Sequence, residues 1–383
     1  MKIDFQKMTQ FVLMKQHLLS GHKAADVLRA TRDVVGLHAT NSTTPYLSLF
    51  ARVRNFEKKH FDIELYHTRN LVRTECMRST LFIVPKETIP ILYQIYKAEF
   101  TDKLLIDWRI STQEYKDMSN LILEMLKGKI MTASQIKRLL PENVQRTLTR
   151  KVGKNLVRIT NVNLVLIWMT QQGILLSMKQ PGTWKIAGLN CYSRFIDWFP
   201  DINLNQVSRD KAMIQLVKAY VQSYGPVTKK DIHWWSGLKP SEVEHIIEML
   251  KSQLAECEVS GLDSKFIMLQ SDALRLKQFK PSKRHSISFL PYEDSFLKGY
   301  NDRERLVSKE QYHKVYHHGE ASPSILIDGQ VAGTWQLETQ EGKSKLTFQL
   351  FERTNTTLHK SIRNEAKALS TFAFGDNVQI KEA

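Results

Sequence analysis

The order of the predicted helices and strands constrains the fold of this chain more than any other feature. Residues 128–190 predict helices that end at Gly173, followed by two strand-like segments, ILLSMKQ and TWKIAGL, around Pro181-Gly182. Residues 209–270 predict the same order, with RDKAMIQLVKAYVQSY as the first helix and CEVSG and SKFIML as the strand-like segments. Helices followed by a β-hairpin are typical of a winged-helix unit. We therefore predict at least two such units, and a third in the N-terminal region.

Residues that favour helix starts support both predicted units. Thr132 stands before ASQIKRLL and Thr228 before KKDIHWWSG, where a threonine hydroxyl can accept a hydrogen bond from a free N–H group of the first turn. Pro240 opens PSEVEHIIEMLKSQL, and proline is tolerated there because its missing N–H would have no partner within the helix. We expect helices to begin at these three places.

The two ends of the chain complete the predicted fold. The N-terminal region predicts mainly helices, with a short buried strand over Leu81–Val84 that is closed by Pro85. From about residue 284, the segments HSISFLP, SILIDG, VAGTWQLE and KLTFQLF predict short strands, and LHKSIRNEAKALSTFAF predicts a last helix before a polar tail. The expected fold class is α+β, mainly α with β, with tandem winged-helix domains followed by a C-terminal β-rich domain. The expected domains are residues 1–125, which carry a candidate active-site motif, 126–205, 206–280, and 281–383.

The net charge predicts a polyanionic partner. The chain has 55 Lys and Arg against 39 Asp and Glu, a formal net charge of +16 at pH 7. Nucleic acid is the commonest partner of such a protein, and an anionic membrane surface is the alternative. The start of the chain lacks a long apolar run, and the most apolar internal stretch, Asn161–Met169, is far shorter than the ~20 residues of a membrane helix. We expect a cytoplasmic, nucleoid-associated protein that binds double-stranded DNA and no membrane.

The cysteines and histidines do not predict a metal site. The three cysteines stand far apart with no Cys-x-x-Cys pair, which favours a reducing compartment, and the 12 histidines include no HExxH spacing. We predict neither a metal nor another cofactor. No heptad run or other symmetric interaction motif is visible, so a monomer is expected.

One stretch of the chain concentrates positive charge. Nine basic residues and a single acid, Glu142, lie between Lys127 and Arg158, and such a run can neutralise several phosphates of a duplex. The alternative is a solvated helix face whose compensating acids lie elsewhere. Arg73 and Arg78 flank the first candidate wing, with helix packing as their alternative role. The candidate DNA contacts are Arg52, Arg73, Arg78, Lys137, Arg138, Arg146, Arg150, Lys151, Lys154 and Arg158.

Five segments of the chain resemble one known family. They are VVGLHATNSTTPYLSLFARV, LVRTECMRSTLFIVP, YGPVTKKDIHWWSGL, FLPYEDSFLKGYNDR and ILIDGQVAGTWQL, and they occur in the order of the winged-helix DNA glycosylases called AlkZ-like proteins. The resemblance implies tandem winged helices, binding of damaged duplex DNA and excision of bulky N-alkylated purines. In some members it also implies the unhooking of interstrand crosslinks.

The resemblance also implies where the chemistry takes place. The family holds its water with a Gln-x-Gln or Gln-x-Asp motif, and the matching position here is His38-Ala39-Thr40, which departs from the motif at both residues. A neutral imidazole with an ordinary pKa of ~6.5 can accept a proton from water, so His38 is the candidate base. Thr40 and Asn41 are candidates to orient the same water. The alternative is that His38 is a buried structural histidine.

The sequence allows two roles for Asp294 and two for the tandem tryptophans. Asp294 either orients the water or pairs with an arginine and fixes a domain junction. Trp234-Trp235 could stack on bases, but packing in the core is favoured for at least one ring.

The predicted function is a monofunctional glycosylase that acts on N7-alkylpurines or on bulky or crosslinked bases by water attack at C1′. The alternatives are a non-catalytic duplex-DNA-binding protein, such as a lesion sensor or regulator, and an RNA-binding or protein-interaction protein.

Overall fold

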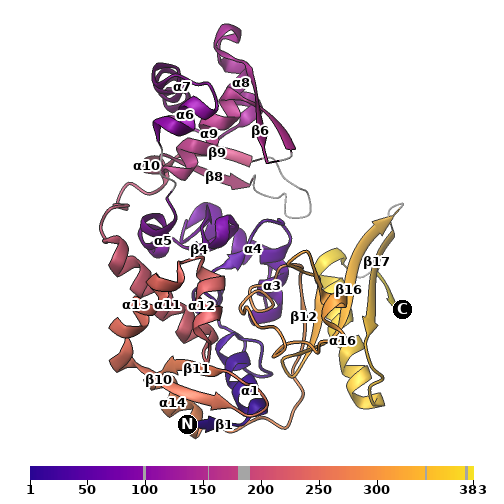
Figure 1. Cartoon of the computed structure of the whole chain (residues 1–383). Helices are drawn as coiled ribbons and strands as arrows, with labels where there is room; N and C mark the ends of the chain where they lie inside the picture. The colour runs from indigo at the N-terminus through magenta and orange to yellow at the C-terminus, as the bar shows by residue number, and fades with distance from the viewer. Residues whose placement is uncertain (98–100, 154, 180–189, 341–342, 376–377) are drawn as a thin grey trace.

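The structure combines helical units with small sheets, as the α+β prediction requires. The computed structural model describes residues 1–97, 101–153, 155–179, 190–340, 343–375 and 378–383. In Figure 1 the unit built from residues 102–198 stands at the top, the unit of residues 209–278 lies below it on the left, and the C-terminal sheet lies on the right. The N-terminal helices lie between these parts. The boundaries 1–125, 126–205, 206–280 and 281–383 remain predictions.

The N-terminal region consists of helices around a small sheet. The strand predicted over Leu81–Val84 is confirmed, and it is the central strand of a three-stranded sheet in the order β2-β4-β3. The strand β2 is antiparallel to β4, and His38 faces Phe82 across the pair. The elements are β1 (Lys2–Ile3), α1 (Phe5–Lys15), α2 (Val27–Asp33), β2 (Leu37–His38), α3 (Thr44–Arg52), α4 (Lys58–Asp62), β3 (Leu71–Glu75), β4 (Leu81–Pro85) and α5 (Ile89–Tyr96).

The second unit has an element that the sequence did not predict. Thr132 caps α8 as expected, and its hydroxyl accepts a hydrogen bond from the N–H of Gln135 at 3.2 Å. Strands β6 and β7 form a separate hairpin inside the basic stretch, whereas the predicted strand TWKIAGL lies outside the described residues. The elements are α6 (Asp102–Asp107), α7 (Thr112–Met125), β5 (Met131–Thr132), α8 (Ala133–Leu139), β6 (Thr147–Val152), β7 (Asn155–Thr160), α9 (Asn161–Gln171), β8 (Leu175–Lys179), β9 (Asn190–Arg194) and α10 (Phe195–Trp198).

The third unit has three helices and a hairpin in the predicted order, followed by a further helix, α14. Thr228 caps α12 by accepting from the N–H of Asp231 at 3.0 Å, and Pro240 is the first residue of α13. The start of the chain joins this unit, because β1 pairs with β10 in parallel. The elements are α11 (Arg209–Tyr224), α12 (Lys229–Ser236), α13 (Pro240–Met249), β10 (Leu254–Val259), β11 (Lys265–Leu269) and α14 (Gln270–Gln278).

The C-terminal part is a five-stranded sheet covered by one helix. The strand order is β12-β15-β16-β17-β18, and the predicted polar tail supplies β18, which runs parallel to β17. Helix α16 buries Ile362, Ala366 and Leu369 in one cluster with the sheet residues Trp335 and Phe348. The elements are β12 (Ile287–Leu290), α15 (Tyr312–Val315), β13 (Tyr316–His317), β14 (Glu320–Ala321), β15 (Ser324–Ile327), β16 (Gln330–Gln340), β17 (Lys343–Leu350), α16 (Thr356–Phe374) and β18 (Val378–Glu382).

The largest hydrophobic core joins the third unit to the C-terminal part. Tyr220 of α11 stacks on Trp235 at 4.5 Å between ring centroids, and Tyr224 meets Tyr300 edge to face. Trp235 is therefore a core residue, as expected for at least one of the tandem tryptophans, whereas Trp234 is only partly buried.

No helix in the described part of the chain is long and apolar enough to span a bilayer.

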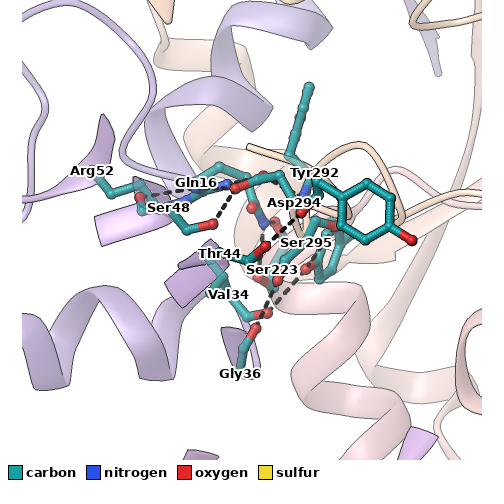
Figure 2. A network of polar contacts seen from close by, with 12 residues as sticks. Gln16, Val34, Gly36, Thr44, Ser48, Arg52, Ser223, Tyr292, Asp294 and Ser295 are labelled. Atoms are coloured by element: carbon teal, nitrogen blue, oxygen red, sulfur yellow. Dashed lines mark hydrogen bonds and ion pairs between the residues drawn. The ribbon is translucent and has the colours of Figure 1, made fainter. Parts of the chain in front are cut away.

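A buried polar network fastens the C-terminal part to the N-terminal helices (Figure 2). Its centre is the bidentate ion pair between Arg52 of α3 and Asp294, at 2.7 and 2.8 Å, and both side chains are completely buried. The hydroxyl of Ser48 donates to the same carboxylate, and the hydroxyl of Thr44 donates to the carbonyl of Tyr292 at 2.8 Å. Burial raises the pKa of Asp294, but the charge and hydrogen bonds of Arg52 outweigh it and hold that pKa below its ordinary value.

This geometry corrects the prediction that Arg52 contacts DNA. A fully buried guanidinium that is held by a carboxylate has no exposed donor for a phosphate. Asp294 takes the second of its two expected roles, because it pairs with an arginine where two parts of the chain meet.

Arg52→Met should lower the free energy of unfolding by about 3–5 kcal/mol, because it leaves the carboxylate of Asp294 buried without its counter-charge. Arg54→Met, two residues away at an exposed position, is the matched control and should change stability by less than about 0.5 kcal/mol. Urea unfolding at pH 7 measures both. Equal stabilities of the two variants would contradict a structural role for the ion pair.

Candidate active site at His38

The small N-terminal sheet places His38 at the wall of a cavity. The side chain of His38 is 5% exposed, and its imidazole meets the ring of Phe82 edge to face at 5.3 Å between centroids. The cavity has a volume of about 220 Å³ and is lined by His38, Met77, Arg78, Thr80, Phe82, Trp235, Glu293, Ser295, Lys298, His318, Gly319 and Glu320. Ala39, the next residue, lines a different cavity of about 50 Å³, since successive side chains of an extended chain face opposite sides.

Glu293 is the carboxylate that faces His38. Its Oε2 lies 3.5 Å from Nε2 of His38, and its Oε1 accepts a hydrogen bond from the N–H of Ala321 at 2.6 Å and pairs with Nζ of Lys298 at 3.2 Å. Glu293 has a left-handed backbone with φ 57°, a conformation that costs free energy for a residue with a side chain. The turn thereby directs two successive carboxylates apart, with Glu293 facing the cavity and Asp294 facing the buried network.

The second ring nitrogen of His38 has no partner among the described residues. Its Nδ1 is buried and without a hydrogen bond. Buried polar atoms are nearly always hydrogen-bonded, so an unpaired nitrogen at a cavity wall is available to a water or a substrate group. A neutral imidazole has one nitrogen that donates and one that accepts.

The surroundings of His38 favour its neutral form. Burial is the largest effect and lowers the pKa of the imidazole below its ordinary value; the charge of Glu293 opposes this effect, whereas Lys298 and Arg78 add to it. The direction of this shift favours the neutral imidazole, the form that can accept a proton.

The structure separates His38 from the other residues predicted for the water. Thr40 and Asn41 are exposed, and neither is among the described residues that line the cavity. The side-chain oxygen of Asn41 accepts hydrogen bonds from the N–H and the hydroxyl of Thr43 at 2.9 and 2.8 Å, and these bonds form a local turn before α3.

The sequence analysis missed Glu293, although this residue stands directly before Asp294, which was a candidate. Only the backbone conformation decides which of the two adjacent carboxylates faces the cavity.

The predicted DNA contacts of the second unit fall into three groups. Arg138, Lys151 and Arg158 are exposed, and the last two lie on the β6–β7 hairpin. Arg146 and Arg150 form ion pairs with Glu114 and Asp107, each at 2.7 Å, so acids elsewhere in the unit partly compensate their charge. Lys137 is partly buried, and Lys154 lies outside the described residues.

Arg73 and Arg78 differ in their access to solvent. Arg73 on β3 is only 8% exposed, and its Nη1 donates to the side-chain oxygen of Asn190 at 3.4 Å. Arg78 is exposed, lines the His38 cavity and stacks on Trp234. Within the described residues, no three His, Cys, Asp or Glu side chains come together as metal ligands would.

Comparison with known proteins identifies the class of this chain. The family model "DNA glycosylase AlkZ-like" matches residues 31–372. The chain therefore belongs to the AlkZ-like DNA glycosylase family, and the resemblance predicted from five sequence segments is confirmed. DNA glycosylases are N-glycosyl hydrolases, enzymes that act on a base taken out of the stack.

One organism supplies both a curated relative and a solved structure with this fold. The "Interstrand DNA cross-link repair glycosylase" of Streptomyces sahachiroi is 26% identical over 162 residues, which are 41% of this chain and 42% of that protein. The alignment thus spans less than half of the curated relative. The solved structure of the Streptomyces sahachiroi DNA glycosylase AlkZ has a TM-score of 0.77 and 17% identity and covers 100% of both chains, so the two share a fold.

The imidazole of His38 should titrate below pH 6.5 because burial disfavours its charged form. A ¹⁵N NMR titration, with the His38 signals assigned from a His38→Asn variant, measures the midpoint. Glu293→Gln should lower the midpoint further, since Glu293 stabilises the imidazolium, and Lys298→Met should raise it. A midpoint at or above 6.5 that neither variant moves would contradict this description of the cavity.

Proposed function

We propose that this protein is a monofunctional DNA glycosylase that removes N-alkylated purines from duplex DNA by water attack at C1′. N7-alkylpurines and bulky or crosslinked adducts are the proposed substrates. The observation that carries the proposal is that His38 shares one cavity with Glu293, with Nε2 of His38 3.5 Å from Oε2 of Glu293. The resemblance, which matches His38-Ala39-Thr40 to the family's motif, supports it. The name of the Streptomyces sahachiroi relative supports crosslinked DNA as a substrate.

The chemistry requires little acid catalysis. Alkylation at N7 places positive charge on the purine and makes it a good leaving group, so the enzyme must mainly stabilise an oxocarbenium-like sugar and supply a water. The anionic Glu293 side chain offers the stabilising charge, because preorganised charge acts strongly in a cavity from which bulk water is excluded. Neutral His38 accepts the proton of the water as it attacks C1′.

Hydrolysis, without a covalent step, fits the lysine of this cavity. A lyase would need an amine free to attack the sugar. Nζ of Lys298 donates to the carbonyl of Gly319 at 2.5 Å and pairs with Glu293, so its hydrogen bonds serve to hold the carboxylate in place. The amine is therefore assigned a positioning role.

The second unit gives this activity a duplex-binding surface. Arg138, Lys151 and Arg158 present exposed charges on the unit that stands at the top of Figure 1. Phosphate contacts of this kind supply affinity without reading sequence, which suits a repair enzyme that meets damage in any context. We propose that the protein acts as a monomer on nucleoid DNA.

His38→Ala should reduce excision by about 10²–10⁴-fold, the usual contribution of general base catalysis. A duplex with one N7-alkylguanine is incubated with the protein, and abasic sites are then cleaved with alkali, with spontaneous depurination as the baseline. Thr40→Ala is the matched control and should excise at nearly the wild-type rate, because its side chain is exposed and away from the described cavity wall.

Binding must be measured beside excision. The dissociation constant for a duplex with a stable tetrahydrofuran abasic site should be the same for wild type and His38→Ala. Wild-type protein that binds this duplex tightly but excises none of several small and bulky adducts would contradict the glycosylase proposal and favour a lesion sensor.

The exposed charges of the second unit predict a salt dependence. A triple variant with Arg138→Gln, Lys151→Gln and Arg158→Gln should have a shallower slope of log K against log salt, by about 0.9 for each phosphate that is no longer neutralised. Lys360→Gln and Lys367→Gln at exposed positions of α16 form the control pair. Equal slopes for the two sets of variants would show that these three side chains do not contact DNA phosphates.

A further inference from the structure

We propose that Arg78, Lys298 and Arg303 form a seat for one DNA backbone phosphate, that of the nucleotide whose sugar faces His38. This inference rests on the proposed function, because it assigns the phosphate to the nucleotide under attack. It differs from general groove binding, since one particular phosphate position in the substrate would carry the effect.

Three cations gather around one indole ring. The guanidinium carbons of Arg78 and Arg303 lie 4.0 and 5.1 Å from the ring centroid of Trp234, and Nζ of Lys298 lies 5.7 Å from it. An aromatic ring attracts cations but cannot neutralise them. Arg78 and Lys298 line the His38 cavity. Arg303 is 6% exposed and lies behind them on the same indole ring, where it also stacks on Tyr316 at 4.0 Å.

The acids near these cations do not balance them. Glu293 pairs with Lys298 at 3.2 Å, and it also faces His38. Among the described residues, Arg78 has no hydrogen bond or ion pair, and Nε of Arg303 is buried without a hydrogen-bond partner. Burial is the largest effect and lowers the pKa of Arg78 and of Lys298; repulsion from neighbouring arginines adds to it, and Glu293 opposes it. A bound anion would relieve this repulsion, and a phosphate can accept hydrogen bonds from several of these donors at once.

The backbone holds Arg78 in place for such a contact. Arg78 and Ser79 are consecutive non-glycine residues in the left-handed region, with φ of 56° and 54°. This conformation is strained for residues with a side chain and is found mainly where a site requires it. The turn is closed by the hydrogen bond from the N–H of Cys76 to the carbonyl of Thr80 at 3.0 Å, and by that from the N–H of Ser79 to the carbonyl of Cys76 at 2.9 Å.

The position of the seat indicates a phosphodiester of the substrate. The cavity of about 220 Å³ has His38 and Glu293 on its wall and Arg78 and Lys298 among the same lining residues. Each phosphate of a nucleotide is bonded to its sugar, so a sugar that presents C1′ to His38 brings a flanking phosphate to the same cavity. Free phosphate offers the same chemistry, and the experiment must separate the two.

Methylphosphonate substitution tests the assignment. A neutral methylphosphonate is placed, one position at a time, on either side of a tetrahydrofuran abasic site in a duplex, and dissociation constants are measured by fluorescence anisotropy. Wild type should bind about 10–100-fold more weakly at one position, the value expected for a charge-assisted contact. Arg78→Gln should bind the unmodified duplex more weakly by a similar factor, with no further weakening at that position. Lys360→Gln should keep the full wild-type sensitivity.

The outcomes separate this seat from the glycosylase proposal, because binding to an uncleavable duplex requires no chemistry. Arg78 is exposed, so its variant should keep the wild-type Tm. If each methylphosphonate weakened binding by the same factor in wild type and in Arg78→Gln, the seat would be overturned, even if excision were found. Inorganic phosphate that raises the Tm of wild type but not of Arg78→Gln, with no sensitive position in the duplex, would indicate a free-phosphate site and would also overturn the assignment. If the seat is correct, Lys298→Met should also bind the unmodified duplex more weakly and should lose the sensitivity to a methylphosphonate at that position.

Discussion

The ion pair between Arg52 and Asp294 is the constraint on which the candidate site depends. It joins α3 of the N-terminal region to the turn after β12, and both partners are excluded from solvent. Glu293 is the neighbour of Asp294, so the same turn that buries one carboxylate presents the other to His38. A shift of this turn would move Glu293 away from the imidazole. The stability of the junction and the geometry of the cavity therefore have one physical origin.

The cavity uses charge on both of its sides. In the proposed reaction Glu293 offers a negative group where a sugar cation would form, and its ion pair with Lys298 holds the carboxylate in place. Arg78 lines the same cavity, and together with Arg303 it adds positive charge around Trp234, which we propose a phosphate neutralises. His38 is thus part of a larger arrangement. Its neutral state follows from burial, and its orientation toward Glu293 follows from the pairing of β2 with β4.

Much of the fold could be predicted from the sequence because local signals were strong. The caps at Thr132 and Thr228, Pro240, the strand over Leu81–Val84 and the last helix all appear as expected. The β6–β7 hairpin could not be recognised, since its dominant signal is positive charge and apolar alternation is weak. The role of Arg52 was misjudged because sequence does not reveal a partner 242 residues away. Glu293 was missed for a related reason, since the left-handed φ that directs it into the cavity depends on its tertiary setting.

The central claim is that His38 and Glu293 act as a unit, His38 as the base for the water and Glu293 as the charge that stabilises the sugar cation. Single-turnover excision of one N7-alkylguanine by His38→Ala, by Glu293→Gln and by the double variant tests it most directly. Groups that act as a unit have strongly non-additive effects. The account predicts that the double variant is no slower than the slower single variant, with binding to the abasic-site duplex unchanged. Rate reductions that multiply in the double variant, or a Glu293→Gln enzyme as fast as wild type, would contradict it.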